Sequence, residues 1–79
     1  MKSPEDIGAL IAAKLLAEEL PKEPPGATLT GTGSGAPCDA CDAPILPADV
    51  ECACEFPLHS ALRFHVECFT EWRRQQPPG

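Results

Sequence analysis

Two short pairs of cysteine and histidine residues constrain this 79-residue chain more than any other feature. The first pair is Cys38-x-x-Cys41, and after 23 further residues the second pair is His65-x-x-Cys68. In a tight turn, a C-x-x-C pair lets two thiolates converge on one ion. On a helix, residues three apart share a face, so His65 and Cys68 can reach the same ion. The two pairs therefore predict a closed tetrahedral Cys3His site for one structural Zn²⁺.

The size of the chain favours such a site, because 79 residues form one small domain that buries too little surface to be stabilised by its core alone. The five Cys residues cannot all pair with one another. We expect no signal peptide at the N-terminus, because Lys2 is soon followed by Glu5 and Asp6. No stretch approaches the roughly 18 apolar residues of a membrane span. We therefore expect a cytoplasmic protein without membrane contact, in which clustered Cys and His bind metal.

Residues 1–20 predict an N-terminal helix that ends at Pro21. Ser3 can cap this helix, and Pro4 suits its first position. Its apolar residues fall on two faces, one of which is interrupted by Lys14. Because an isolated helix of about 17 residues is marginal in water, three outcomes remain open. The helix docks on the rest of the chain, self-associates or pairs with a partner, or frays.

Residues 21–37 contain four Pro and four Gly and show no apolar periodicity, so they predict a flexible linker. The sequence GTGSG within them does not predict a phosphate-binding loop, because it leads into Pro37 and Cys38 rather than into a helix. The remaining chain divides into a single-zinc finger over residues 38–76 and a tail over residues 77–79.

Within the finger, the residues between the two pairs predict a β-hairpin. The stretch VECACEF alternates, and its apolar side holds Val50, Cys52, Cys54 and Phe56. A turn follows, and ALRF returns as the second strand. The helix after it places four residues on one face, two as metal ligands and two as apolar cover. These four are His65, Cys68, Phe69 and Trp72.

The order of knuckle, hairpin and helix resembles a treble-clef zinc finger. The pattern C-x2-C, 23 residues, H-x2-C-F is similar to the first zinc module of LIM domains, over residues 38–76. LIM domains normally supply two more cysteines for a second zinc just after this pattern, whereas this chain has Thr70 to Arg73 there. The resemblance implies a small zinc-stabilised α+β fold with one zinc, and an adaptor function only by analogy of fold.

Three potential ligands lie outside the two pairs. Cys52 and Cys54 share the apolar side of the predicted strand, so we interpret them as buried small hydrophobic residues. His59 falls in the predicted turn and is interpreted as a solvent-facing residue. Replacement of a proposed ligand by one of these three residues remains an alternative.

The charge of the chain and its closed site limit the possible functions. The net charge is −6, and residues 38–76 hold three Arg against seven acids, which argues against nucleic acid as a partner. A site filled by four protein ligands leaves no water to activate, so no enzyme activity and no catalytic residue is expected. The leading hypothesis is a protein-protein interaction or regulatory module. The alternatives are a nucleic-acid-binding transcriptional regulator, and a redox or metal sensor that uses Cys52 and Cys54.

Overall fold

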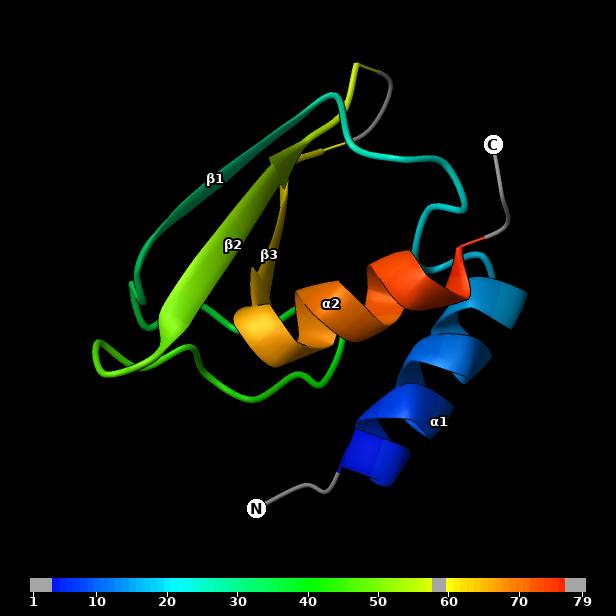
Figure 1. Cartoon of the computed structure of the whole chain (residues 1–79), viewed down its shortest axis with the longest axis horizontal. Helices are drawn as coiled ribbons and strands as arrows, with labels where there is room; N and C mark the ends of the chain where they lie inside the picture. Colours follow the sequence, from blue (N-terminus) through cyan, green and yellow to red (C-terminus); the bar gives the residue numbers. More distant parts are fainter. Residues whose placement is uncertain (1–3, 58–59, 77–79) are drawn as a thin grey trace.

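The computed structural model describes residues 4–57 and 60–76, in which two helices and a three-stranded antiparallel sheet form one α+β unit. The strand order is β1-β2-β3, and α2 lies between the sheet and α1 (Figure 1). This arrangement confirms the predicted α+β class and the predicted hairpin and C-terminal helix. The elements are α1 (Pro4–Leu16), β1 (Ala27–Thr32), β2 (Val50–Glu55), β3 (Leu62–His65) and α2 (Val66–Gln75).

The alternation of β2 determines which face of the sheet is buried. Cys52 and Cys54 are both buried, whereas Glu51 and Ala53 on the other face are only partly covered. The register pairs Cys52 with Phe64 of β3, which is fully buried. Successive side chains of a strand point to opposite faces, so the expected apolar side of β2 is the side that packs on α2. Val50, at the start of the strand, is exposed.

An aromatic cluster joins the sheet to α2. The rings of Phe64 and Trp72 stack with centroids 4.9 Å apart, and Phe56 meets Trp72 edge-on at 6.0 Å. Trp72 is fully buried, and its indole N–H donates a hydrogen bond to the carbonyl oxygen of Pro21 at 3.0 Å. A buried indole needs such an acceptor. The cluster therefore fixes α2 on the sheet and also holds the segment that leaves α1.

Of the three outcomes open for the N-terminal helix, the structure shows docking on the rest of the chain. Ile11 and Leu15 of α1 are buried in the common core. The side-chain amide of Gln75 in α2 also donates to the carbonyl oxygen of Gly8 at 2.9 Å. The two helices approach closely there, because a Cβ atom at Gly8 would lie 3.4 Å from the Glu71 carboxylate.

The helix is shorter than expected, ending at Leu16 rather than near Pro21. Glu18 adopts a left-handed conformation with φ of 62°, and the N–H groups of Glu19 and Leu20 turn back to the carbonyl oxygen of Lys14. This reversal ends a helix in the way that a C-terminal glycine usually does. It brings Leu20, which is 2% exposed, into the core.

The segment expected to be a flexible linker, residues 21–37, is instead largely part of the fold. It contains β1, which pairs with β2 along its whole length. After β1, the N–H of Gly33 donates to Asp49 and that of Gly35 donates to Ile45. Gly33 is buried against the next loop, where an added Cβ would lie 2.0 Å from the Leu46 carbonyl oxygen. Glycine is required at this position by close approach of two backbones.

Candidate metal centre

The first pair of predicted ligands lies in a tight turn between β1 and β2. The N–H of Asp42 donates to the carbonyl oxygen of Cys38 at 2.8 Å, and the N–H of Cys38 donates to that of Ala43 at 2.9 Å. Asp42 has a φ of 66°, a left-handed value that an aspartate tolerates better than most residues. The turn holds Cys38 and Cys41 with their sulfurs on its inner side, and both residues are buried.

Asp39 ties this turn to β3, which carries the next ligand. Its N–H donates to the carbonyl oxygen of Arg63, and its carboxylate accepts the N–H of Arg63, both at 2.8 Å. Arg63 lies two residues before His65 on the same strand. The two reciprocal hydrogen bonds therefore set the distance between the turn and the histidine.

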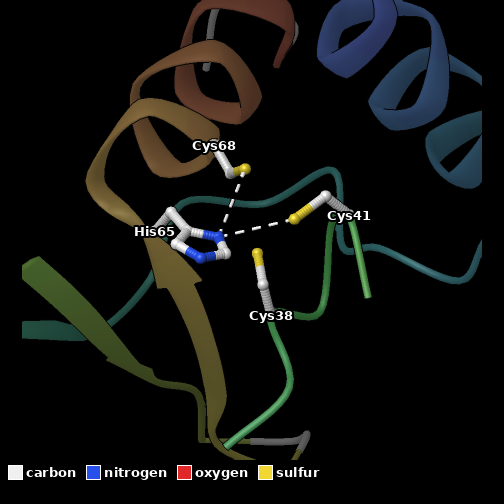
Figure 2. A group of neighbouring side chains, drawn as sticks. All are labelled: Cys38, Cys41, His65 and Cys68. Carbon is white, nitrogen blue, oxygen red and sulfur yellow. Dashed lines mark hydrogen bonds between the residues drawn. The ribbon is translucent and has the colours of Figure 1, made fainter. Parts of the chain in front are cut away.

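The second pair lies where β3 passes directly into α2. His65 is the last residue of β3 and the N-cap of α2, with extended dihedral angles (φ −63°, ψ 151°), and Cys68 follows in the first turn of the helix. Cys68 is almost fully buried at 1% exposure. The strand-to-helix junction directs both side chains towards the turn that holds Cys38 and Cys41 (Figure 2).

All four predicted ligands converge, with their ligand atoms within 4.8 Å of one another. The Nδ1 atom of His65 lies 3.4 Å from the Cys41 sulfur and 3.9 Å from the Cys68 sulfur (Figure 2). Around a tetrahedral zinc, metal-ligand bonds of about 2.0 to 2.3 Å place neighbouring ligand atoms roughly 3.6 to 3.8 Å apart. The side chains of this chain therefore fit a single tetrahedral metal ion.

The imidazole of His65 is oriented by contacts to its other nitrogen. Its Nε2 atom lies 3.1 Å from the carbonyl oxygen of Pro44 and 3.7 Å from the Asp49 carboxylate. Because a carbonyl oxygen can only accept a hydrogen bond, Nε2 carries the hydrogen in this contact. Nδ1 then keeps its lone pair for the cluster. A hydrogen bond of this kind fixes the tautomer and the ring orientation of a metal-binding histidine.

The surroundings of the cluster favour one thiolate, that of Cys38. A hydrogen bond from the Cys68 thiol lowers the pKa of Cys38 to about 4, against the opposing effect of burial, and the backbone amides of Cys41, His65 and Ala40 lower it further. The same hydrogen bond to Cys38 raises the pKa of Cys68, as does burial. The protein alone thus stabilises the first thiolate and resists ionisation of Cys68. A divalent cation would remove that resistance by supplying positive charge.

Lys14 of α1 also contacts the turn that carries Cys38 and Cys41, a contact that the sequence did not predict. Its ammonium group donates to the carbonyl oxygen of Asp39 at 2.9 Å and to the carboxylate of Asp42 at 3.0 Å. These contacts fasten α1 to the loop that carries Cys38 and Cys41. The only signal in the sequence is that Lys14 interrupts an otherwise apolar face of its helix.

The two remaining cysteines lie outside the cluster, as interpreted from the alternation of β2. Cys52 and Cys54 are buried, and burial raises the pKa of both thiols. The Thr28 hydroxyl donates to the Cys54 sulfur at 3.9 Å. Sensing thiols need a lowered pKa and access to solvent, so this environment opposes the redox-sensor alternative. His59 lies outside the described residues.

Within residues 4–57 and 60–76, neither helix has the length and hydrophobicity needed to cross a bilayer. No protein-family model matches the chain, and neither a curated protein nor a solved structure is significantly similar to it.

Proposed function

We propose that the chain is a small non-enzymatic protein, folded around one structural Zn²⁺, that serves as a protein-protein interaction or regulatory module. The observation that carries the metal assignment is the convergence of four ligand atoms within 4.8 Å, three of them sulfurs. Three thiolates and one imidazole form a donor set that zinc prefers in structural sites. Cys38, Cys41, His65 and Cys68 would hold the ion, which would act as a cross-link between the turn, β3 and α2.

Zinc in this position would contribute directly to folding. Structural zinc binds finger peptides with an apparent free energy of about 10 to 16 kcal/mol near neutral pH. That amount is comparable to the whole free energy of unfolding of a small domain, which is about 5 to 15 kcal/mol. Removal of the metal is therefore expected to unfold the chain rather than only to loosen the site.

The order of the turn, the β2-β3 hairpin and α2 supports a treble-clef-like finger, to which β1 and α1 are added on the N-terminal side. Four protein ligands would close the coordination sphere and leave no position for a substrate or an activated water. This supports a binding role over a catalytic one. The net charge of −6 supports a protein partner over nucleic acid.

The metal assignment is tested by native mass spectrometry of the purified full chain and by its unfolding after chelation. We expect one zinc per chain, and absorption typical of tetrahedral thiolate ligation after exchange for Co²⁺. Cys68→Ser should lose the metal and the cooperative unfolding transition. Cys54→Ser is a matched control, because Cys54 is equally buried but lies outside the cluster. A cooperative fold that survives complete chelation would contradict the proposal.

The interaction role is tested by affinity capture from a nuclease-treated lysate with the zinc-loaded chain. Partners recovered by the wild-type chain and lost with Cys68→Ser would support it, with Cys54→Ser again as the control. Gel shifts at low salt test the nucleic-acid alternative. If every protein partner captured from an untreated lysate is lost after nuclease treatment, the interaction role is contradicted.

A further inference from the structure

The strand β1 lies at the edge of the sheet, and its outer edge exposes backbone N–H and C=O groups. No other strand in the described part of the chain pairs with them. In an antiparallel pair, residues that exchange hydrogen bonds with the partner alternate with residues that do not. The N–H of Gly33 donates to Asp49 at 3.1 Å and continues the β1-β2 register by one residue. Every second residue before Gly33 therefore exchanges backbone hydrogen bonds with β2, and these residues are Gly31, Leu29 and Ala27. The backbone groups that point away from the sheet are those of Thr28, Thr30 and Thr32.

This edge lacks the features that usually prevent a further strand from pairing. Proteins protect an edge with charged residues, proline, a bulge or a covering segment. The strand, ATLTGT, has no charge and no proline, and all six of its residues are exposed. Within residues 4–57 and 60–76, β1 has a strand on one side only. Both ends are held, because Gly26 bonds to Glu55 and Gly33 to Asp49.

The outer face beside this edge has a defined chemical character. Leu29 is 63% exposed and lies between two small residues, Ala27 and Gly31. The register places Glu55 of β2 opposite Ala27, and Glu51 opposite Gly31.

Of these two carboxylates, Glu55 is the one available to a partner. The side chain of Glu51 is only 13% exposed, accepts hydrogen bonds from Ser34 and lies 3.9 Å from the Arg63 guanidinium. Glu55 is exposed, and because Ala27 offers almost no side chain, a long cationic side chain of an added strand can reach over Ala27 to this carboxylate.

We propose that β1 binds an extended, basic segment of another protein, which joins the sheet as a fourth strand next to β1. This inference rests on the proposed interaction function and names its surface and the chemistry of its partner. The bound segment would place an apolar residue against Leu29 and a Lys or Arg two residues away from it, above Ala27 and facing Glu55. Backbone hydrogen bonds from Thr28, Thr30 and Thr32 would supply affinity, and the cation would supply specificity.

A second copy of the chain is a poorer occupant of the same edge. Each copy carries a net charge of −6, and pairing of two β1 strands would bring the exposed Glu55 of both copies to one face of a six-stranded sheet. Like charges across an interface oppose association. A basic segment gains from the same carboxylate.

The test uses the zinc-loaded full chain and the peptide acetyl-Lys-Thr-Val-Thr-Lys-amide, whose lysines and valine share one face when extended. At about 90% occupancy, amide hydrogen exchange of the three outward threonines should slow about tenfold. The amides of Ala27, Leu29 and Gly31, already bonded to β2, should change little. A peptide with Glu in place of both Lys should bind at least tenfold more weakly. Absence of slowing at about 1 mM lysine peptide would overturn the proposal.

Thr30→Pro removes one outward N–H and leaves the β2 hydrogen bonds of the neighbouring residues in place. Proline is tolerated on an edge strand for this reason. We expect Thr30→Pro to bind the peptide at least tenfold more weakly, and Thr30→Ala, which keeps the N–H, to bind within about twofold of wild type. As a control, the zinc content and the cooperative unfolding transition are measured for Thr30→Pro and Thr30→Ala, to verify that each variant is folded. Equal binding by Thr30→Pro would overturn the proposal.

Two further results separate this proposal from the interaction function itself. A partner captured equally well by wild type and Thr30→Pro would keep the interaction function but overturn the assignment to β1. A concentration-dependent dimer that Thr30→Pro abolishes would assign the edge to a second copy, and this would also overturn the proposal.

Discussion

The Nε2 atom of His65 lies 3.1 Å from the carbonyl oxygen of Pro44, so one ring contacts both the Cys38, Cys41 and Cys68 cluster and the loop that follows the turn holding Cys38 and Cys41. The contact requires hydrogen on Nε2 and leaves the Nδ1 lone pair facing the cysteine sulfurs, where the proposed metal would bind. It also restrains the ring plane, because Pro44, which carries the acceptor, is joined to Pro37 by an isolated β-bridge. The ring orientation is therefore fixed by the fold before a metal binds.

The tautomer of His65 is a direct prediction. In the zinc-loaded chain, long-range ¹⁵N–¹H correlations should show a hydrogen on Nε2 and none on Nδ1. The variant His59→Gln removes the only other imidazole in the sequence and makes the assignment unambiguous. A hydrogen found on Nδ1 would contradict both the orientation and the proposed ligand atom.

Lys14→Met tests the attachment of α1 to the turn that carries Cys38 and Cys41. The substitution keeps an apolar stem of similar length but removes the hydrogen bonds to Asp39 and Asp42. We expect the free energy of unfolding of the zinc-loaded chain to fall by about 1 to 2 kcal/mol. The measurement is urea unfolding followed by circular dichroism. Lys22→Met, at an exposed position, is the control and should stay within about 0.5 kcal/mol of wild type.

Gly33→Ala tests the close backbone contact after β1. The added methyl group would lie 2.0 Å from the Leu46 carbonyl oxygen, so the segments must separate and lose hydrogen bonds. We expect a loss of about 2 to 3 kcal/mol in the free energy of unfolding. Gly31→Ala is the matched control: its Cβ meets nothing within 4 Å, and it should be neutral or slightly stabilising. Equal stability of the two variants would show that residues 33–37 are not packed as described.

Trp72→Phe tests the link between α2 and the segment after α1. Phenylalanine keeps an aromatic ring against Phe64 but cannot donate to the Pro21 carbonyl oxygen. We expect the thermal unfolding midpoint to fall, with a loss of about 1 to 3 kcal/mol. Leu16→Ala removes an exposed side chain and should change stability by no more than about 0.5 kcal/mol. An unchanged midpoint for Trp72→Phe would contradict the importance of this hydrogen bond.

The ligand cluster could be predicted from sequence because each half of it is local. The spacing of Cys38 and Cys41 suits one turn, and that of His65 and Cys68 suits the first turn of a helix. The alternation that buries Cys52 and Cys54 is likewise visible in a few consecutive residues. Short-range periodicity of this kind needs no knowledge of the distant chain.

The strand β1 could not be predicted in this way, because its sequence alternates threonine with small residues and carries a single large apolar side chain. What makes it a strand is pairing with β2, some 20 residues away, and that pairing is not encoded in local hydrophobicity. The docking of α1 was undecided for a similar reason. It depends on contacts such as Lys14 with Asp39 and Gln75 with Gly8, which span 25 and 67 residues.

The long separation between the two ligand pairs has a consequence for biosynthesis. A nascent chain that has not yet reached His65 carries only Cys38 and Cys41, which is half of a ligand set. It also lacks the helix whose Trp72 and Gln75 hold the N-terminal segments in place. With zinc as the proposed cross-link, metal uptake and folding are therefore expected to occur together, and only after α2 has emerged from the ribosome.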